Sequence, residues 1–182
     1  MTQWAALLKG INVGGARSLR MPDLAAFLEG LGFCCVRTLL ASGNVVFDAT
    51  EKNAAALEAM LEREAAARLS LETDFFLRSA EELAEVVKAN PFPEAALERP
   101  DKLLVAFGRS AVPPDLPERL AGIHDGPERL AVAGRELFID FPQGQGRSKL
   151  WPALAKLGAS GTGTGRNWNT VIKIRQTMLD MA

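Results

Sequence analysis

The sequence is poor in the residues on which common catalytic and metal sites are built. Its 182 residues include no tyrosine and a single histidine, His124. Zinc sites with paired histidines are thereby excluded, and a Ser-His or Cys-His nucleophile would rest on His124 alone. His124 stands in a Gly-Ile-His-Asp-Gly segment that is typical of a loop, so we expect a solvated histidine and no metal site.

Cysteine is equally scarce. The two cysteines, Cys34 and Cys35, are adjacent at the beginning of a predicted strand, where successive side chains point to opposite faces. They build no disulfide framework, which fits a reducing compartment. Nothing beside them in sequence except Arg37 would activate a thiolate, so we expect buried structural cysteines rather than a reactive pair.

Neither sign of charge dominates, and no long hydrophobic run is present. The net charge is −1, so no global positive field attracts nucleic acid or anionic lipid. The apolar run 4–8 is interrupted by Lys9 and Gly10, far short of the roughly 20 residues of a membrane span. With 48% hydrophobic and 24% charged residues the composition is globular, and we expect a cytoplasmic location, no membrane partner and no cofactor.

Apolar residues alternate between strand and helix periods along the chain. They predict strands at 3–8, 36–40, 45–48 and 73–77, with helices beginning at Pro22, near Thr50 and at Ser79. The order recurs with strands at 103–107, 130–133, 136–140 and about 162–165, and helices at 117–121, 148–157 and 170–179. We therefore expect an α+β fold of two small βαββαβ (ferredoxin-like) modules, each followed by a trailing helix. The modules would span 1–90 and 101–182, with 91–100 as a linker.

Two polar, glycine-rich strings follow short apolar runs in the first module. One is Lys-Gly-Ile-Asn-Val-Gly-Gly at 9–15, and the other is Ser-Gly-Asn at 42–44. The first and second strands of a βαββαβ sheet run parallel, so both strings should emerge at the same end of the sheet. Turn geometry alone explains much of their glycine, whereas a ligand cradle would also use their charged and amide groups. The ligand-binding candidates here are Lys9, Asn12, Gly14, Gly15, Ser42, Gly43 and Asn44.

In the second module the candidates are two basic strings, which we expect at the opposite end of the sheet, after its third and fourth strands. Each precedes a predicted helix, whose first N–H groups and partial positive charge favour an anion. The ligand-binding candidates are Arg147, Ser148, Lys149, Arg166, Asn167, Trp168 and Asn169. Ser148 also has the alternative role of a simple helix cap.

These strings together resemble a known family. Residues 7–15, 38–47 around Ser42-Gly43-Asn44, 146–150 and 166–171 are similar to the domain of unknown function 1697. The resemblance spans nearly the whole chain and implies a compact two-part α+β protein. It implies no activity, cofactor or catalytic residue. Residues 161–165 contain more glycine than a strand favours, and here the sequence departs from the family.

Three classes of function agree with these residues. The first is a binding module for a phosphate-bearing small molecule or short nucleic acid, although 42–47 supplies one aromatic where an RNP1 platform uses several. The second is an enzyme on a phosphorylated or carboxylated metabolite, with Lys9 or Lys149 as electrophile and Asn12, Asn44 and Arg166 orienting the substrate. The third is an interaction protein, in which a sheet edge pairs with a second copy as a homodimer. We favour the first.

Overall fold

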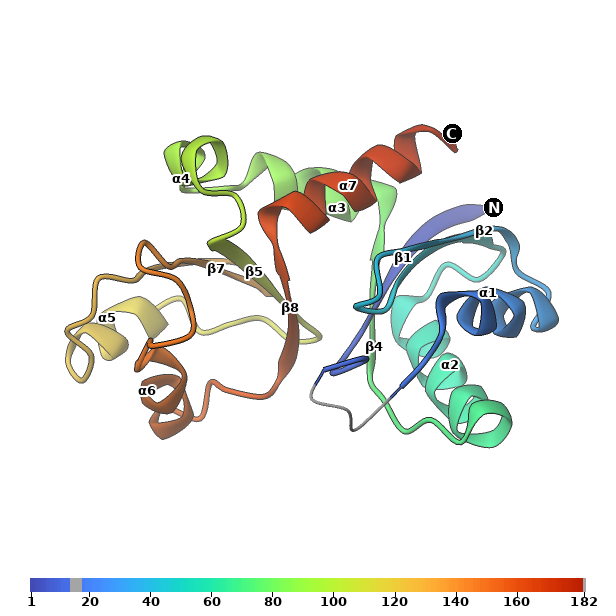
Figure 1. The fold of residues 1–182 in the computed structure, drawn as a ribbon, viewed down its shortest axis with the longest axis horizontal. Helices are drawn as coiled ribbons and strands as arrows, with labels where there is room; N and C mark the ends of the chain where they lie inside the picture. The colour runs from blue at the N-terminus through green and yellow to red at the C-terminus, as the bar shows by residue number, and fades with distance from the viewer. Residues whose placement is uncertain (14–17, 182) are drawn as a thin grey trace. The chain divides into compact units, whose positions relative to one another are not determined.

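The computed structural model describes residues 1–13 and 18–181 (Figure 1). The chain divides into two compact units. The first unit comprises Met1–Ala84 together with Lys173–Ala182, and the second comprises Glu85–Ile172. None of the helices in the described residues has the length and apolar character that a membrane crossing requires.

The first unit is a four-stranded antiparallel sheet with helices α1 and α2 on one face (Figure 1). Its strand order is β2-β3-β1-β4. The elements are β1 (Thr2–Leu8), α1 (Met21–Gly30), β2 (Cys34–Leu39), β3 (Asn44–Ala49), α2 (Ala54–Leu69) and β4 (Phe75–Ser79), followed by α3 (Ala80–Lys88). The periodic apolar residues of both helices pack on alternate residues of β1 and β4, as the helix and strand periods require.

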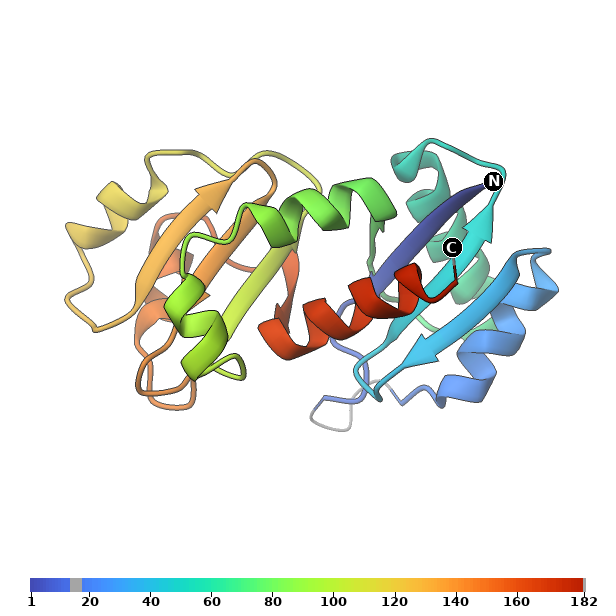
Figure 2. The same cartoon turned by 90° about the horizontal axis from the view of Figure 1, so that it is seen from above.

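The second unit repeats this arrangement with shorter helices. Its antiparallel sheet has the order β6-β7-β5-β8, and its strands lie side by side in Figure 2. The elements are α4 (Pro93–Glu98), β5 (Leu103–Gly108), α5 (Leu116–Ala121), β6 (Arg129–Ala133), β7 (Glu136–Asp140), α6 (Leu150–Lys156) and β8 (Gly163–Asn167). Helix α7 (Trp168–Leu179) follows β8, and its residues from Lys173 onward belong to the first unit. Helices α5 and α6 pack on one face of this sheet.

Two antiparallel four-stranded sheets with helices confirm the α+β prediction. A capping box stabilises the start of α3, because Ser79 Oγ accepts from Glu82 N at 3.2 Å and Ser79 N donates to Glu82 Oε2 at 2.9 Å. The strand expected near 162–165 is β8. The stretch 91–100 contains α4, which begins with Pro93 in its first turn, a position where proline favours a helix.

Both cysteines are exposed, so the prediction that they are buried is wrong. Strand β2 lies at the edge of its sheet, and its register with β3 shifts between Cys34 and Arg37. Cys35 has φ +54 within this bulge. A bulge bends an edge strand and interrupts the alternation of its side chains between the two faces. The sequence has no glycine between Cys34 and Arg37 that would indicate a bulge.

A buried carboxylate at the end of β7 joins the segment after α4 to strand β6. Asp140 at the end of β7 is fully buried and accepts two hydrogen bonds from Arg99, at 3.0 and 2.7 Å, and two from Arg129, at 3.1 and 2.7 Å. Arg129 also pairs with Glu94 of α4 and lies 4.6 Å from the centre of the Phe92 ring. Burial raises the pKa of Asp140, but the two guanidinium groups outweigh it and leave the pKa below its usual value.

Candidate functional site

The structure brings the two glycine-rich strings of the first unit together. Leu8 N donates to Gly43 O at 2.9 Å, so the end of β1 is bonded to the hairpin between β2 and β3. Gly43 has φ +74, and a Cβ on it would lie 3.0 Å from Leu8 Cβ. Glycine at 43 is therefore explained by both the backbone conformation and the close approach of β1.

The two amide side chains of these strings act as internal braces. Asn12 Nδ2 donates to Leu19 O at 2.9 Å and to Ala41 O at 2.6 Å, and Asn12 Oδ1 accepts from Leu19 N at 2.9 Å. Asn44 is fully buried, and its Nδ2 donates to Leu39 O and to Ser42 Oγ, both at 3.0 Å. Both amides thus hold the loops in shape, and ligand contact by Asn12, Ser42, Gly43 or Asn44 stays a prediction.

Lys9 is tied to the beginning of β4. Its Nζ lies 3.5 Å from Asp74 Oδ2, and its carbonyl oxygen accepts from Thr73 Oγ1 at 2.8 Å. The ion pair is partly exposed, so it contributes little stability and leaves Lys9 able to exchange partners. The predicted binding residues Gly14 and Gly15 lie outside the described residues.

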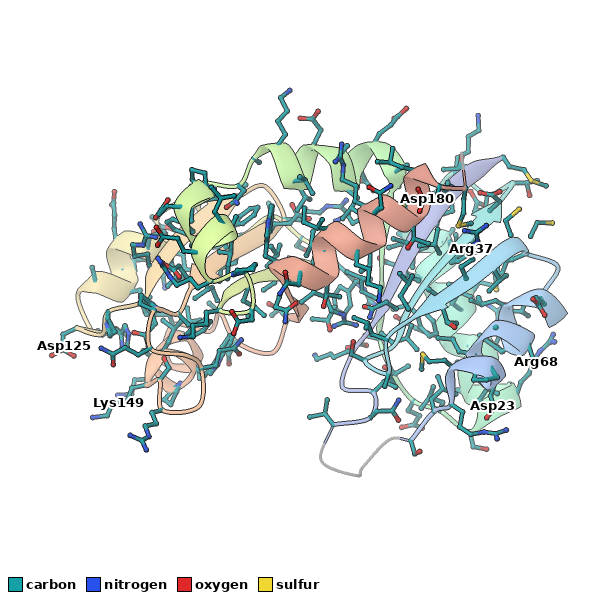
Figure 3. The ribbon with its side chains drawn as sticks, turned by 45° about the horizontal axis from the view of Figure 1, so that its top comes forward. Asp23, Arg37, Arg68, Asp125, Lys149 and Asp180 are labelled. Carbon is teal, nitrogen blue, oxygen red and sulfur yellow. The ribbon has the colours of Figure 1, made fainter. Side chains whose placement is uncertain are left out.

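In the second unit, the basic residues Arg147 and Lys149 line a pocket of about 340 Å³, which we call the His124 pocket. Its wall combines the turn after α5 with the loop before α6: His124, Asp125, Gly126, Pro127, Glu128, Gln143, Gly144, Arg147, Ser148 and Lys149. Figure 3 labels Asp125 and Lys149, whose side chains extend from this part of the unit. This lining does not include the second basic string, Arg166, Asn167, Trp168 and Asn169.

A hydrogen-bonded trio forms one side of the His124 pocket. His124 Nε2 lies 2.8 Å from Glu128 Oε2, and Ser148 Oγ donates to Glu128 Oε1. Ser148 Oγ also accepts from Leu150 N at 3.1 Å at the start of α6, although the N-cap residue of this helix is Lys149. The side chains of His124 and Glu128 are only 8% and 6% exposed. The prediction of a solvated histidine is therefore wrong, because the chain folds Glu128 back onto the ring.

The order of Glu128 in the trio decides its chemistry. In a hydrolytic triad the histidine stands between the hydroxyl and the carboxylate, so that it can take the hydroxyl proton. Here the carboxylate stands in the middle, so the trio orients side chains and does not activate Ser148. Burial raises the pKa of Glu128, but the hydrogen bonds from Ser148 and His124 outweigh it and lower the pKa.

Gly126 lines the His124 pocket, although the sequence did not mark it as a candidate. A Cβ on Gly126 would collide with Glu128 Oε2 and with His124 Nε2. A larger residue at this position would therefore displace the side chains of the His124–Glu128 pair from the geometry described here. The Gly-Pro step at 126–127 indicates a turn, but nothing in it indicates that His124 and Glu128 are hydrogen-bonded beside it.

Arg147 and Lys149 are the free cations of the His124 pocket. Both side chains are exposed, and neither forms an ion pair or side-chain hydrogen bond with any residue that the structure describes. The carboxylate of Glu128 is almost fully buried and accepts from Ser148, so Asp125 is the exposed carboxylate that shares this lining with Arg147 and Lys149.

The string 166–169 takes up structural positions. Asn167 Oδ1 caps α7 by accepting from Thr170 N at 3.0 Å and from Thr170 Oγ1 at 2.9 Å. Arg166 is 6% exposed, and its Nη1 donates to Thr164 Oγ1 at 2.8 Å and to Gly165 O at 2.9 Å. Burial lowers the pKa of Arg166 to about 10. Trp168 is 8% exposed, so its indole offers little surface for stacking. Ligand contact by Arg166, Asn167, Trp168 and Asn169 stays a prediction.

The residues that could hold a metal or cofactor are few. Within 1–13 and 18–181, no three His, Cys, Asp or Glu side chains gather as a metal site.

Comparison with known proteins supplies a family and a fold. A family model described as "Protein of unknown function (DUF1697)" matches residues 1–138, a range that ends before Arg147 and Lys149. Among solved structures, the chain is similar to the conserved bacterial protein SP0830 from Streptococcus pneumoniae. The TM-score is 0.73 at 23% sequence identity, covering 98% of this chain and 99% of that chain. A likeness at this identity shows the shared fold. A search of curated proteins finds no match.

Proposed function

This chain belongs to the DUF1697 family, whose description assigns no function, and we propose that it is a binding module for a phosphate-bearing small molecule. The ligand occupies the His124 pocket, where Arg147 and Lys149 bind its phosphate and the trio of His124, Glu128 and Ser148 keeps the wall rigid.

The observation that carries this proposal is the pair of unpartnered cations on one pocket. Arg147 and Lys149 stand two residues apart, on either side of Ser148, and have no ion-pair partner among the described residues. Guanidinium and ammonium groups are the usual protein partners of phosphate, and such charge-assisted hydrogen bonds are about twice as strong as neutral ones. Cations that served only to stabilise the fold would be expected to lie against carboxylates, as Arg99 and Arg129 do with Asp140.

The size of the pocket supports a small ligand. A volume of about 340 Å³ is at the lower end of the roughly 300–1,000 Å³ of small-molecule sites. The net charge of −1 favours one phosphorylated molecule over a long nucleic acid, whose binding relies on many phosphate contacts.

We also assign both units to the ferredoxin-like arrangement. Support comes from the β-α-β-β-α-β order of each unit and from the antiparallel orders β2-β3-β1-β4 and β6-β7-β5-β8. The chain would then be a tandem of two such modules.

Isothermal titration calorimetry with inorganic phosphate and with AMP tests the function. We expect wild-type protein to bind AMP, and an Arg147→Ala/Lys149→Ala double variant to bind it at least about tenfold more weakly, with the unfolding temperature unchanged. An Arg37→Ala/Lys52→Ala variant removes two exposed cations from the first unit and is the control for net charge. Equal affinity of the two double variants, or no binding by wild type, contradicts the proposal. Native mass spectrometry of freshly purified protein would identify a retained ligand.

A further inference from the structure

The last strands of the two sheets, β4 and β8, occupy equivalent positions. Ser79 ends β4 and caps α3, and Asn167 ends β8 and caps α7. Leu77 and Gly165 each lie two residues before the cap residue and are therefore equivalent. Leu77 pairs with Ala6 of β1, and Gly165 pairs with Ala106 of β5. One step of alternation further, Leu8 pairs with Phe75 in the first unit, whereas Gly108 pairs with Gly163 in the second.

Large side chains in the first unit are thus replaced by glycine in the second. Leu8, Phe75 and Leu77 are fully buried and belong to the core between the sheet and helices α1 and α2. At the equivalent positions, Gly108, Gly163 and Gly165 supply no side chain, and helices α5 and α6 are also the shorter pair. The second unit therefore lacks the groups that fill this part of the first core.

The space left by these glycines is a pocket of about 330 Å³, which we call the glycine-strand pocket. Gly108, Gly163 and Gly165 all line it, and every other lining residue also belongs to the second unit. Residues 158–162, the glycine-rich turn between α6 and β8, form part of its wall. The glycines that are too numerous for an ordinary strand are thereby explained as the floor of a cavity.

The glycines differ in what holds them. A Cβ on Gly163 would lie 2.5 Å from the carbonyl oxygen of Phe107, and one on Gly108 would lie 3.0 Å from the carbonyl oxygen of Arg135. Backbone packing therefore requires glycine at both positions. A Cβ on Gly165 would meet only the flexible side chain of Leu104, at 3.2 Å. Backbone packing therefore does not force glycine at 165. What glycine does at this position is leave the cavity open.

The walls of the glycine-strand pocket are apolar. They include Leu137 of β7, Trp151 and Leu154 of α6, and Leu157, which directly follows α6 in the chain. Trp151 is 36% exposed, and its ring centre lies 5.8 Å from that of Phe141. An aromatic side chain held against the core at one edge and open at the other is a common surface for an apolar ligand.

The charged residues of the lining are all cationic. Arg109, Arg119 and Arg135 line the pocket, and no Asp or Glu is among its described lining residues. Arg119, on α5, is exposed and has no ion-pair partner among the described residues. Guanidinium groups bind carboxylates through two parallel hydrogen bonds, and an adjacent apolar wall strengthens such a contact by excluding water.

We propose that the glycine-strand pocket binds an organic acid that has an apolar body and one carboxylate. The apolar body lies over Gly165 among Leu137, Trp151 and Leu154, where the first unit places its own side chains, and the carboxylate binds Arg119 at the rim. This inference does not depend on the phosphate site, because the two pockets share no lining residue.

Calorimetric titration with decanoate, and with decanol as a matched neutral probe, tests the proposal. Both are used below the concentration at which they aggregate. We expect one decanoate per chain, with decanol bound about tenfold more weakly, since it lacks the charge-assisted hydrogen bond. Arg119→Gln should weaken decanoate about tenfold and leave decanol unchanged, whereas Lys156→Ala, an exposed cation on α6 outside the lining, should change neither.

Gly165→Leu provides the independent arm. It restores the residue type of Leu77, so we expect it to fill the cavity, abolish binding of both probes and maintain or raise the unfolding temperature. If this variant fails to fold, Ala111→Trp at the exposed rim should block the pocket in its place. Absence of decanoate binding to wild type, equal affinity of decanoate and decanol, or undiminished binding by the blocked variant overturns the proposal.

Discussion

Asn12 donates a hydrogen bond of 2.6 Å to the carbonyl oxygen of Ala41, 29 residues away. This bond joins the loop after β1 to the hairpin between β2 and β3, and the same side chain spans Leu19 on the other side. Asn12 itself has φ +57, a conformation that asparagine tolerates better than most residues. Side-chain chemistry and backbone conformation thus both select asparagine here.

Replacing Asn12 tests which of these two properties matters more. Asn12→Ala loses the hydrogen bonds and the conformational tolerance, and we expect it to lower the free energy of unfolding by about 2–3 kcal/mol. Asn12→Gly retains the conformation and should cost about 1 kcal/mol less than the alanine variant. Urea unfolding measures both. Equal stability of Asn12→Ala and wild type would show that the loop does not need its brace.

The carboxylate of Asp140 should matter most at neutral pH. Asp140→Asn leaves Arg99 and Arg129 without their shared partner, and we expect a loss of about 3–5 kcal/mol at pH 7. Because the folded pKa of Asp140 is lowered, its contribution is complete above the unfolded pKa of about 3.9 and is lost as the pH falls through the folded pKa. The difference between wild type and variant in urea titrations should therefore shrink below about pH 4. Asp125→Asn, at an exposed carboxylate of the same unit, is the control; a difference independent of pH would refute the linkage.

Cys35 should be an unreactive thiol in spite of its exposure. A hydrogen bond to Asp48 is the largest cause that raises its pKa, so little thiolate forms near neutral pH. In a Cys34→Ser background, Asp48→Asn should increase the rate of iodoacetamide alkylation at pH 8 several-fold. Asp23→Asn, a carboxylate paired with Arg20, controls for the change in charge. Identical rates with and without Asp48 would mean that the hydrogen bond does not govern reactivity.

Gly126→Ala should damage the His124 pocket specifically. The added Cβ collides with the His124–Glu128 pair, and we expect a loss of about 1–3 kcal/mol, as for other overpacked positions. Gly122→Ala is the matched control, because its Cβ would meet only Arg119 O at an ordinary 3.5 Å. Thermal unfolding compares the two. If Gly122→Ala costs as much as Gly126→Ala, loss of glycine flexibility rather than collision is the cause.

Local periodicity was sufficient to predict the α+β class and the order of strands and helices. The apolar spacing of Leu24, Phe27 and Leu28 predicts α1, and turn residues such as Gly134 separate the paired strands. Helix α4 was missed because its prolines were interpreted as a linker, although proline also begins helices.

The candidate site was harder to predict because its contacts are not local. Arg166 stands among Thr, Gly and Asn, which suggests an exposed string, yet strand alternation places Thr164 and Arg166 together on a buried face. Only the folding of Glu128 onto His124 shows that the histidine is buried. Alternation puts Thr164 and Arg166 on one face, but no local pattern shows that this face is buried or that His124 is.

The short helices α5 and α6 also affect how readily the second unit opens locally. Helix α5 has 6 residues and α6 has 7, against 10 and 16 in α1 and α2. One or two turns have almost no stability of their own and depend on packing against the sheet. With glycine beneath them, they have less to pack against, so their amide hydrogens should exchange with solvent faster than those of α1 and α2. Local opening of this helical layer would give a ligand a route to the floor of the cavity without unfolding the sheet.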